Sequence, residues 1–221
     1  MITCYHGLIG SSRNWAPLSR ILGATDRVLF KDIDYIKQTV TSLISEEQRN
    51  LTQSSSRTTI SVGNSLGCVI ALGIADKVDK IILTAPPYTK KSNFIPRGRD
   101  GVEKYIRGLY CDRPLNISEQ EEMSKIGKQF SKIISDRKNI PALRALRQSL
   151  WDFDYWKMVK LHGKKIHIVL GEEDHLTPVD EISNYIASNI PEVKMDILPG
   201  CGHAVPLEKP ERLAEIIERY K

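Results

Sequence analysis

The residues at positions 59–67 constrain the fold of this chain more than any others. A β-branched, apolar run ends in Gly63-Asn64-Ser65-Leu66-Gly67, and a helix-forming stretch of small residues follows. A serine flanked in this way, after a strand and before a helix, is typical of a sharp turn that lifts the serine hydroxyl above a sheet. The same turn places the Leu66 N–H at a helix N-terminus, where developing negative charge is stabilised.

Two later strand-like runs are each followed by a residue that can activate such a serine. The run 166–171 precedes Asp174, and the run 195–198 precedes His203. A nucleophile needs a base beside it and a third group that orients the base, and Ser65, Asp174 and His203 can supply the three roles in this chain order.

Two alternatives for the acid are weighed against Asp174. Glu172 and Glu173 follow the same strand. The Gly-x-x-Asp spacing from Gly171 favours Asp174.

Four segments together resemble the α/β-hydrolase family over nearly all of the chain. They are the loop 6–11 with Trp15, the turn 63–67, the loop 171–178, and the segment 202–213 with its Gly-His pair. The resemblance implies a mostly parallel, doubly wound sheet with a helical cap. It also implies a Ser65–His203–Asp174 triad, with the N–H groups of Leu8 and Leu66 as the oxyanion hole, and His6 as a residue that fixes the oxyanion loop.

The rest of the pattern agrees with an α/β fold of about six strands, because strand-like and helix-like runs alternate. Strands are expected at 2–5, 27–30, 58–62, 79–84, 165–170 and 193–198, and helices at 13–22, 35–48, 66–76, 178–189 and 209–220. The hydrolase core is therefore predicted at 1–87 and 161–221. Compared with the family, the first antiparallel strand pair is expected to be missing. The strand 27–30 is expected at an exposed edge of the sheet. Such an edge needs cover from a loop or from a partner, which a homodimer would provide.

Residues 88–160 interrupt the alternation and are predicted to form the helical cap. They hold no convincing strand, while apolar residues recur at helical spacing around Ile126 and Phe130. The candidates for inward-facing positions are Tyr88, Phe94, Tyr105, Leu109, Tyr110, Phe130, Leu146, Leu150, Trp151 and Phe153. As substrate contacts we select Tyr88, Tyr110 and Trp151, together with Trp15 from the first loop.

The cap segment is also the basic part of the chain. Of the 32 Lys and Arg and 27 Asp and Glu residues, residues 88–160 hold 16 and 9, and the remainder 16 and 18. A solvated helical surface explains this balance, and an anionic or carrier-protein-linked substrate would explain it too. No nucleic-acid-binding motif accompanies the basic residues.

The four cysteines and the hydropathy pattern suggest a reduced, cytoplasmic protein. The cysteines are scattered without metal-type spacing, so no metal or cofactor is expected. No apolar run approaches membrane-spanning length, and the first residues do not resemble a signal peptide. Cys201 lies two residues before His203 but lacks a turn of its own.

Three functions remain compatible with the sequence, because the fold does not determine the substrate. The first is a serine hydrolase that cleaves a small carboxylic ester, thioester or lactone. The second is a lyase or proton-transfer enzyme that uses the same triad as a base. The third is a non-catalytic receptor that kept the pocket for a small ligand.

Overall fold

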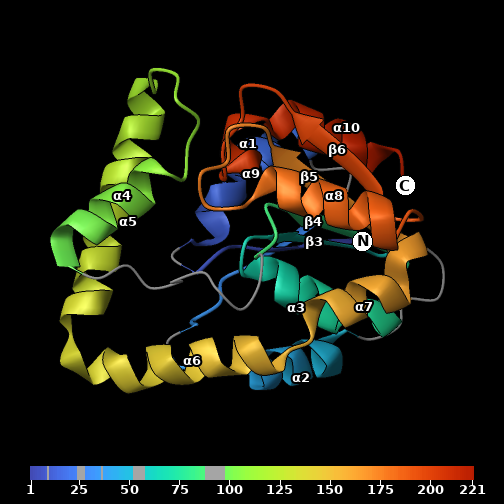
Figure 1. The fold of residues 1–221 in the computed structure, drawn as a ribbon, viewed down its shortest axis with the longest axis horizontal. Helices are drawn as coiled ribbons and strands as arrows, with labels where there is room; N and C mark the ends of the chain where they lie inside the picture. The colour runs from blue at the N-terminus through green and yellow to red at the C-terminus, as the bar shows by residue number, and fades with distance from the viewer. Residues whose placement is uncertain (9, 24–27, 36, 52–57, 88–97) are drawn as a thin grey trace.

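The computed structural model describes residues 1–8, 10–23, 28–35, 37–51, 58–87 and 98–221, which form a three-layer α/β fold (Figure 1). A six-stranded sheet lies at its centre, with all neighbouring strands parallel, in the order β2-β1-β3-β4-β5-β6. The strands are β1 (Ile2–Tyr5), β2 (Val28–Lys31), β3 (Ile60–Asn64), β4 (Lys80–Thr84), β5 (Ile166–Gly171) and β6 (Lys194–Leu198). The α/β class and the six expected strands are confirmed, and β2 lies at one edge as expected.

Helices cover both faces of the sheet and extend from one side of it (Figure 1). They are α1 (Ala16–Leu22), α2 (Val40–Asn50), α3 (Gly67–Gly73), α4 (Gly98–Arg107), α5 (Ile117–Ser135), α6 (Ile140–Asp152), α7 (Tyr155–His162), α8 (Val179–Asn189), α9 (Val205–Glu208) and α10 (Pro210–Glu218). None of the helices in the described ranges is both long and apolar enough to span a bilayer.

The alternation of side chains along the strands separates two apolar cores. Ile81 and Leu83 of β4 face one core, which α2, α3, α7 and α8 cover. Ile82, between them, faces the other core, which α1 and α10 cover. Because successive strand residues point to opposite faces, a strand that is apolar throughout must be covered on both sides.

The strand order determines where a ligand can bind. The chain moves outward from β1 to β2 and then returns to pair β3 on the other side of β1, with Tyr5 opposite Gly63. The loops that leave the carboxyl ends of β1 and β3 therefore diverge to opposite faces and leave a crevice between them. The loop that begins at His6 and the turn that contains Ser65 both lie at this crevice.

The second helix begins later than the sequence predicted. It was expected over 35–48, but α2 starts at Val40, after Thr39 accepts a hydrogen bond from the Ser42 N–H at 3.2 Å. Before this N-cap, Tyr35 is buried and its hydroxyl donates to the His6 carbonyl oxygen at 2.6 Å. This tertiary contact thus holds Tyr35 outside the helix.

Between β4 and β5, the chain from Gly98 to Lys165 is helical except for residues 108–116 and shorter connections. Figure 1 shows α4 and α5 side by side, away from the sheet, while α6 runs toward α2. The predicted cap range 88–160 also includes most of α7, which packs against α3 of the core. Residues 88–97, including Tyr88 and Phe94, lie outside the described residues.

Candidate active site

Ser65 occupies a strained turn directly after β3. Its φ of 52° lies in the left-handed region, which non-glycine residues rarely adopt. The Ser65 N–H donates to the Thr84 carbonyl oxygen at 3.0 Å, and its own carbonyl accepts from the Cys68 N–H at 2.9 Å. These two hydrogen bonds, one to β4 and one to the start of α3, hold the Ser65 backbone in its strained conformation.

The glycines on either side of Ser65 are required by close backbone contacts. A Cβ on Gly67 would overlap the carbonyl oxygen of Tyr5, and one on Gly63 would lie 2.6 Å from the Cys68 nitrogen. The β1 end, the turn and the first residues of α3 therefore approach one another more closely than any side chain would permit.

His203 and Asp174 form a buried pair beside Ser65. The His203 Nδ1 lies 2.8 Å from the Asp174 Oδ2, and both side chains are almost fully shielded from solvent. The other carboxylate oxygen accepts hydrogen bonds from the N–H groups of Leu176 and Thr177, each at 2.8 Å. The carboxylate is thus fixed in place, and it holds the proton of the imidazole on Nδ1.

The charge of Asp174 is preserved despite its burial. Burial alone would raise the pKa of this carboxyl, but His203 and the N–H donors of Thr177 and Leu176 outweigh that effect and hold the pKa below its ordinary value. An ionised Asp174 can therefore orient the imidazole at neutral pH and stabilise its protonated form.

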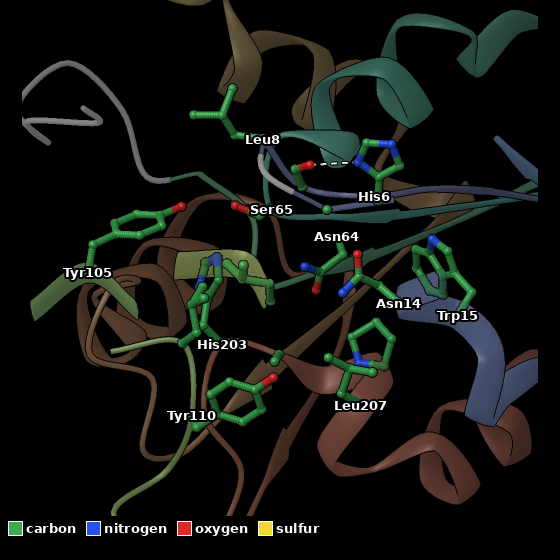
Figure 2. A pocket seen from close by; sticks show the side chains of 16 residues that line it. His6, Leu8, Asn14, Trp15, Asn64, Ser65, Tyr105, Tyr110, His203 and Leu207 are labelled. Atoms are coloured by element: carbon green, nitrogen blue, oxygen red, sulfur yellow. Dashed lines mark hydrogen bonds between the residues drawn. The ribbon is translucent and has the colours of Figure 1, made fainter. Parts of the chain in front are cut away.

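The second nitrogen of His203 is the atom available for chemistry. The Nε2 is buried and has no hydrogen-bond partner in the part of the chain that the structure describes. Ser65 and His203 line the same pocket (Figure 2). Since Nδ1 carries the proton toward Asp174, the lone pair of Nε2 is free to accept a proton within this pocket.

The loop after β1 is held rigidly next to Ser65. His6 Nδ1 donates to the Gly7 carbonyl oxygen at 2.7 Å, and its Nε2 accepts from the Ile33 N–H at 3.0 Å. Burial lowers the pKa of His6, which agrees with a neutral ring that uses both nitrogens. A Cβ on Gly7 would lie 3.2 Å from the Cβ of Ser65, so the backbone of Gly7 lies directly beside the serine.

The structure places the predicted oxyanion donors on the two segments that border Ser65. Leu8 lines the pocket, and Leu66 is buried at the start of α3. Within the described ranges, neither the Leu8 nor the Leu66 N–H donates a hydrogen bond. Both groups are therefore unused by the fold itself.

Of the four predicted substrate contacts, the structure brings two to the pocket. Trp15 and Tyr110 line it together with Leu8 (Figure 2). Trp151, on α6, does not: the residue is 41% exposed, and its ring lies under the Arg147 guanidinium at 4.8 Å. The sequence indicated a helix that ends near Trp151, but it could not show which way this side chain faces. Tyr88 lies outside the described residues.

The pocket has mostly apolar walls and a few polar groups. Besides Ser65 and His203, the lining residues are His6, Gly7, Leu8, Gly10, Asn14, Trp15, Asn64, Tyr105, Leu109, Tyr110, Ile126, Ala204, Pro206 and Leu207. Such a pocket suits a small organic molecule with one polar reactive group.

Glu208 joins the loop of His203 to the segment that follows α4, a role that the sequence did not reveal. Its carboxylate accepts hydrogen bonds from the Gly202 N–H at 2.5 Å and from the Cys111 N–H at 3.0 Å. The Ala204 N–H donates to the Leu109 carbonyl oxygen at 2.8 Å. Two hydrogen bonds thus connect residues 109–111 to the segment around His203, and Glu208 bridges Cys111 and Gly202.

The loop of Asp174 contacts the same segment. The Asp112 N–H donates to Glu173 Oε2 at 3.0 Å, and His175 Nε2 lies 3.3 Å from Asp112 Oδ2. Glu173 therefore has a partner of its own, while Asp174 is the acid that reaches His203. Thr177 adds a hydroxyl 3.2 Å from His203 Nδ1, which sequence reasoning had not assigned.

Among the described residues, neither a metal site nor a cysteine nucleophile is an alternative to this serine site. Among the residues that the structure describes, no three His, Cys, Asp or Glu side chains are grouped to hold a metal ion. All four cysteines are free and buried. Burial raises the pKa of the Cys201 thiol far above its ordinary range, so this cysteine is a poor nucleophile despite its closeness to His203.

Comparisons with known proteins agree with this fold. A family model described as "Alpha/beta hydrolase family" matches residues 5–216. The chain is 25% identical over 181 residues to the uncharacterized hydrolase YugF of Bacillus subtilis, and the match covers 72% of this chain. The chain spans 63% of that relative's length.

Solved structures of esterases and related enzymes are similar over nearly the whole chain. One is Est816, described as an N-acyl homoserine lactone degrading enzyme, with a TM-score of 0.76 and 17% identity over 100% of this chain and 92% of that one. Another is the carboxylesterase CesB (YbfK) from Bacillus subtilis, with a TM-score of 0.66 and 16% identity over 99% of this chain and 82% of that one. At such identities the likeness shows the fold alone.

Proposed function

From the premise that the chain belongs to the alpha/beta hydrolase family, we propose that it is a serine hydrolase that cleaves a small carboxylic ester, thioester or lactone. One observation carries the proposal. His203 is bound through Nδ1 to the Asp174 carboxylate at 2.8 Å, while its Nε2 has no partner among the described residues and shares a pocket with Ser65. A buried imidazole with one nitrogen fixed and the other free is suited to proton transfer.

The reaction follows from these positions. His203 Nε2 takes the proton of the Ser65 hydroxyl while Oγ forms a bond to the substrate carbonyl carbon. The carbonyl electron pair moves to its oxygen, which receives hydrogen bonds from the N–H groups of Leu8 and Leu66. When the tetrahedral intermediate collapses, the bond to the leaving group breaks, and His203 gives its proton to that group.

Water completes the second half of the reaction. His203 removes a proton from a water molecule, whose oxygen attacks the carbonyl carbon of the acyl-enzyme. Collapse of the second intermediate breaks the bond to Ser65 Oγ, which regains a proton from His203 and releases the carboxylic acid.

The pocket supports a substrate of modest size. Its walls are formed largely by apolar side chains, among them Leu109, Ile126 and Leu207. The lactone-degrading and carboxylesterase activities named for two structural neighbours fall within this substrate class.

A panel of chromogenic short-chain esters, thioesters and lactones, scored by acid release, tests the proposal. The wild-type chain is expected to turn over at least one class, and Ser65→Ala is expected to lose that turnover while it keeps the wild-type circular dichroism spectrum and melting temperature. Turnover at a near wild-type rate in Ser65→Ala would remove the assigned nucleophile. Ligand binding by the wild type without any acid release would favour a receptor, and cleavage without an acyl-enzyme would favour a lyase.

A further inference from the structure

Tyr105 is a polar group of the pocket that the proposed mechanism does not use. It lies on α4, and its ring packs against Phe130 of α5, with 5.3 Å between the ring centroids. It lines the same pocket as Ser65 and His203. Figure 2 shows its hydroxyl pointing toward Ser65. A helix far from the serine in sequence thus presents a phenol at the reacting centre.

Among the residues that the structure describes, the Tyr105 hydroxyl has no hydrogen-bond partner. Burial, and next the negative charge of Asp174, raise the pKa of the Tyr105 phenol above its ordinary value, so that the group keeps its proton. Tyr105 is half-buried, and its hydroxyl at the pocket wall can donate to a bound substrate that offers an acceptor.

The position of Tyr105 relative to the other groups suggests which substrate atom it meets. In Figure 2, Tyr105 and His203 approach Ser65 from one side, and Trp15 and Asn14 lie on the other side. The oxyanion donors proposed above are backbone N–H groups on the core loops. His203 delivers its proton to the leaving group, which must therefore lie on the side of His203 and Tyr105.

We propose that the Tyr105 hydroxyl donates a hydrogen bond to the leaving-group oxygen of the bound substrate, and that the site therefore prefers oxygen esters and lactones over thioesters. The inference rests on the proposed function. Sulfur is a weak hydrogen-bond acceptor, so a thioester gains little from a phenol at this position. Tyr105 thus selects among the three substrate classes that the triad alone can cleave.

The variant Tyr105→Phe tests the proposal because it removes only the hydroxyl and keeps the ring against Phe130. The substrates are an oxygen ester and a thioester that are identical except for the leaving-group atom. For the oxygen ester, kcat/KM is expected to fall about tenfold, the effect of one hydrogen bond. For the thioester, it is expected to stay within about twofold.

Tyr185→Phe is the matched control, since Tyr185 lies on α8, packs against the ring of Trp156 and is not among the residues that line the pocket. It is expected to leave both substrates unaffected. Equal losses for the two substrates in Tyr105→Phe, or no loss for the oxygen ester, would overturn the role of Tyr105. Covalent labelling of Ser65 in that variant would show that the nucleophile still works, so failure of the tyrosine proposal is distinguishable from failure of the hydrolase proposal.

Discussion

At the scale of single residues, the site combines one strained backbone position with one nitrogen that the fold leaves unused. Ser65 holds a φ of 52°, and His203 Nε2 lacks a partner among the described residues, although both positions are buried. Each feature lowers the stability of the fold, and it persists because the surrounding structure holds the residue in place. Their presence in the same pocket is the reason that we assign the chemistry to these residues.

The role of Asp174 gives the first prediction. Asp174→Asn is expected to lower kcat by roughly 10³- to 10⁴-fold with little change in KM, because an amide can hold His203 in the wrong tautomer. Steady-state kinetics on the best ester of the panel provide the measurement. Glu173→Gln serves as the control and is expected to be mild, since Glu173 contacts Asp112 rather than His203. A larger loss in Glu173→Gln would move the acid by one residue.

His6 gives a prediction about pH. Burial lowers its pKa in the folded state, so below the ordinary value of about 6.5 the unfolded chain binds a proton that the fold does not. The contribution of His6 to stability is therefore complete above that pH and is lost as the pH falls. Urea unfolding at pH 7.5 and 5.5 should show a smaller loss of unfolding free energy in His6→Gln than in the wild type. An equal loss would exclude His6 as a source of the acid sensitivity.

At the scale of elements, the residues that follow α4 connect the two loops that carry the acid and the base. Glu208 at the end of α9 accepts from the N–H groups of Gly202 and Cys111, and Glu173 accepts from the N–H of Asp112. The loop of Asp174 and the loop of His203 thus share one neighbour. We infer that this segment, at the base of the predicted cap, keeps His203 in register with Ser65.

Glu208→Gln tests the connection. Since an amide offers one acceptor oxygen in place of two, one of the two N–H groups loses its partner, at a cost of about 1–3 kcal/mol. We expect kcat to fall about tenfold or more while KM changes little, because Glu208 positions His203 and does not line the pocket. Glu211→Gln, at an exposed position on α10, is the control. A change confined to KM, or none at all, would argue against a positioning role.

The elements also show how far the sequence could be interpreted. The sequence predicted the glycine-flanked turn and the strands that precede Ser65, Asp174 and His203, because these features depend on local geometry. The contacts of Glu208 and the orientation of Tyr105 could not be predicted, since they depend on how α4 and the residues after it pack against distant segments, such as that of Glu208, which is 97 residues from Cys111. Trp151 was assigned to the pocket but lies exposed beside Arg147, because the sequence of a helix does not show which of its residues face the site.

At the scale of the whole molecule, the parallel sheet explains why the pocket lies where it does. The loops after β1 and β3 diverge at the point where the strand order reverses, and they carry His6 and Ser65. The segment between β4 and β5 borders the pocket and contributes Tyr105 and Ile126 to its walls. The core thus holds the proposed reacting groups, while the helices between β4 and β5 shape the space for the substrate.

The positive charge of the segment between β4 and β5 leads to a proposal about the substrate. We propose that the basic segment 88–160 favours an anionic or carrier-linked substrate. Lys125, Lys128 and Lys132 are exposed on α5 at helical spacing. The attraction between exposed charges is screened over about 8–10 Å at ordinary ionic strength. For an anionic ester, kcat/KM should therefore fall as salt rises, and a neutral ester should barely respond.

Charge reversal separates this effect from a general salt effect. Changing Lys125, Lys128 and Lys132 to Glu should lower kcat/KM for the anionic ester through slower association, and should spare the neutral one. The control reverses three exposed charges outside the segment, at Arg49, Lys77 and Lys164. The same salt response for anionic and neutral esters would leave the basic residues as a solvated surface.

The central claim is that Ser65 is a nucleophile activated by His203, and covalent labelling tests it most directly. An alkyl fluorophosphonate should modify one residue at neutral pH, because only a serine beside a base reacts readily. Mass spectrometry of the digested protein is expected to find the adduct on Ser65 alone and to find it lost in His203→Ala. Modification of another residue, or an unmodified but folded sample, would contradict the account.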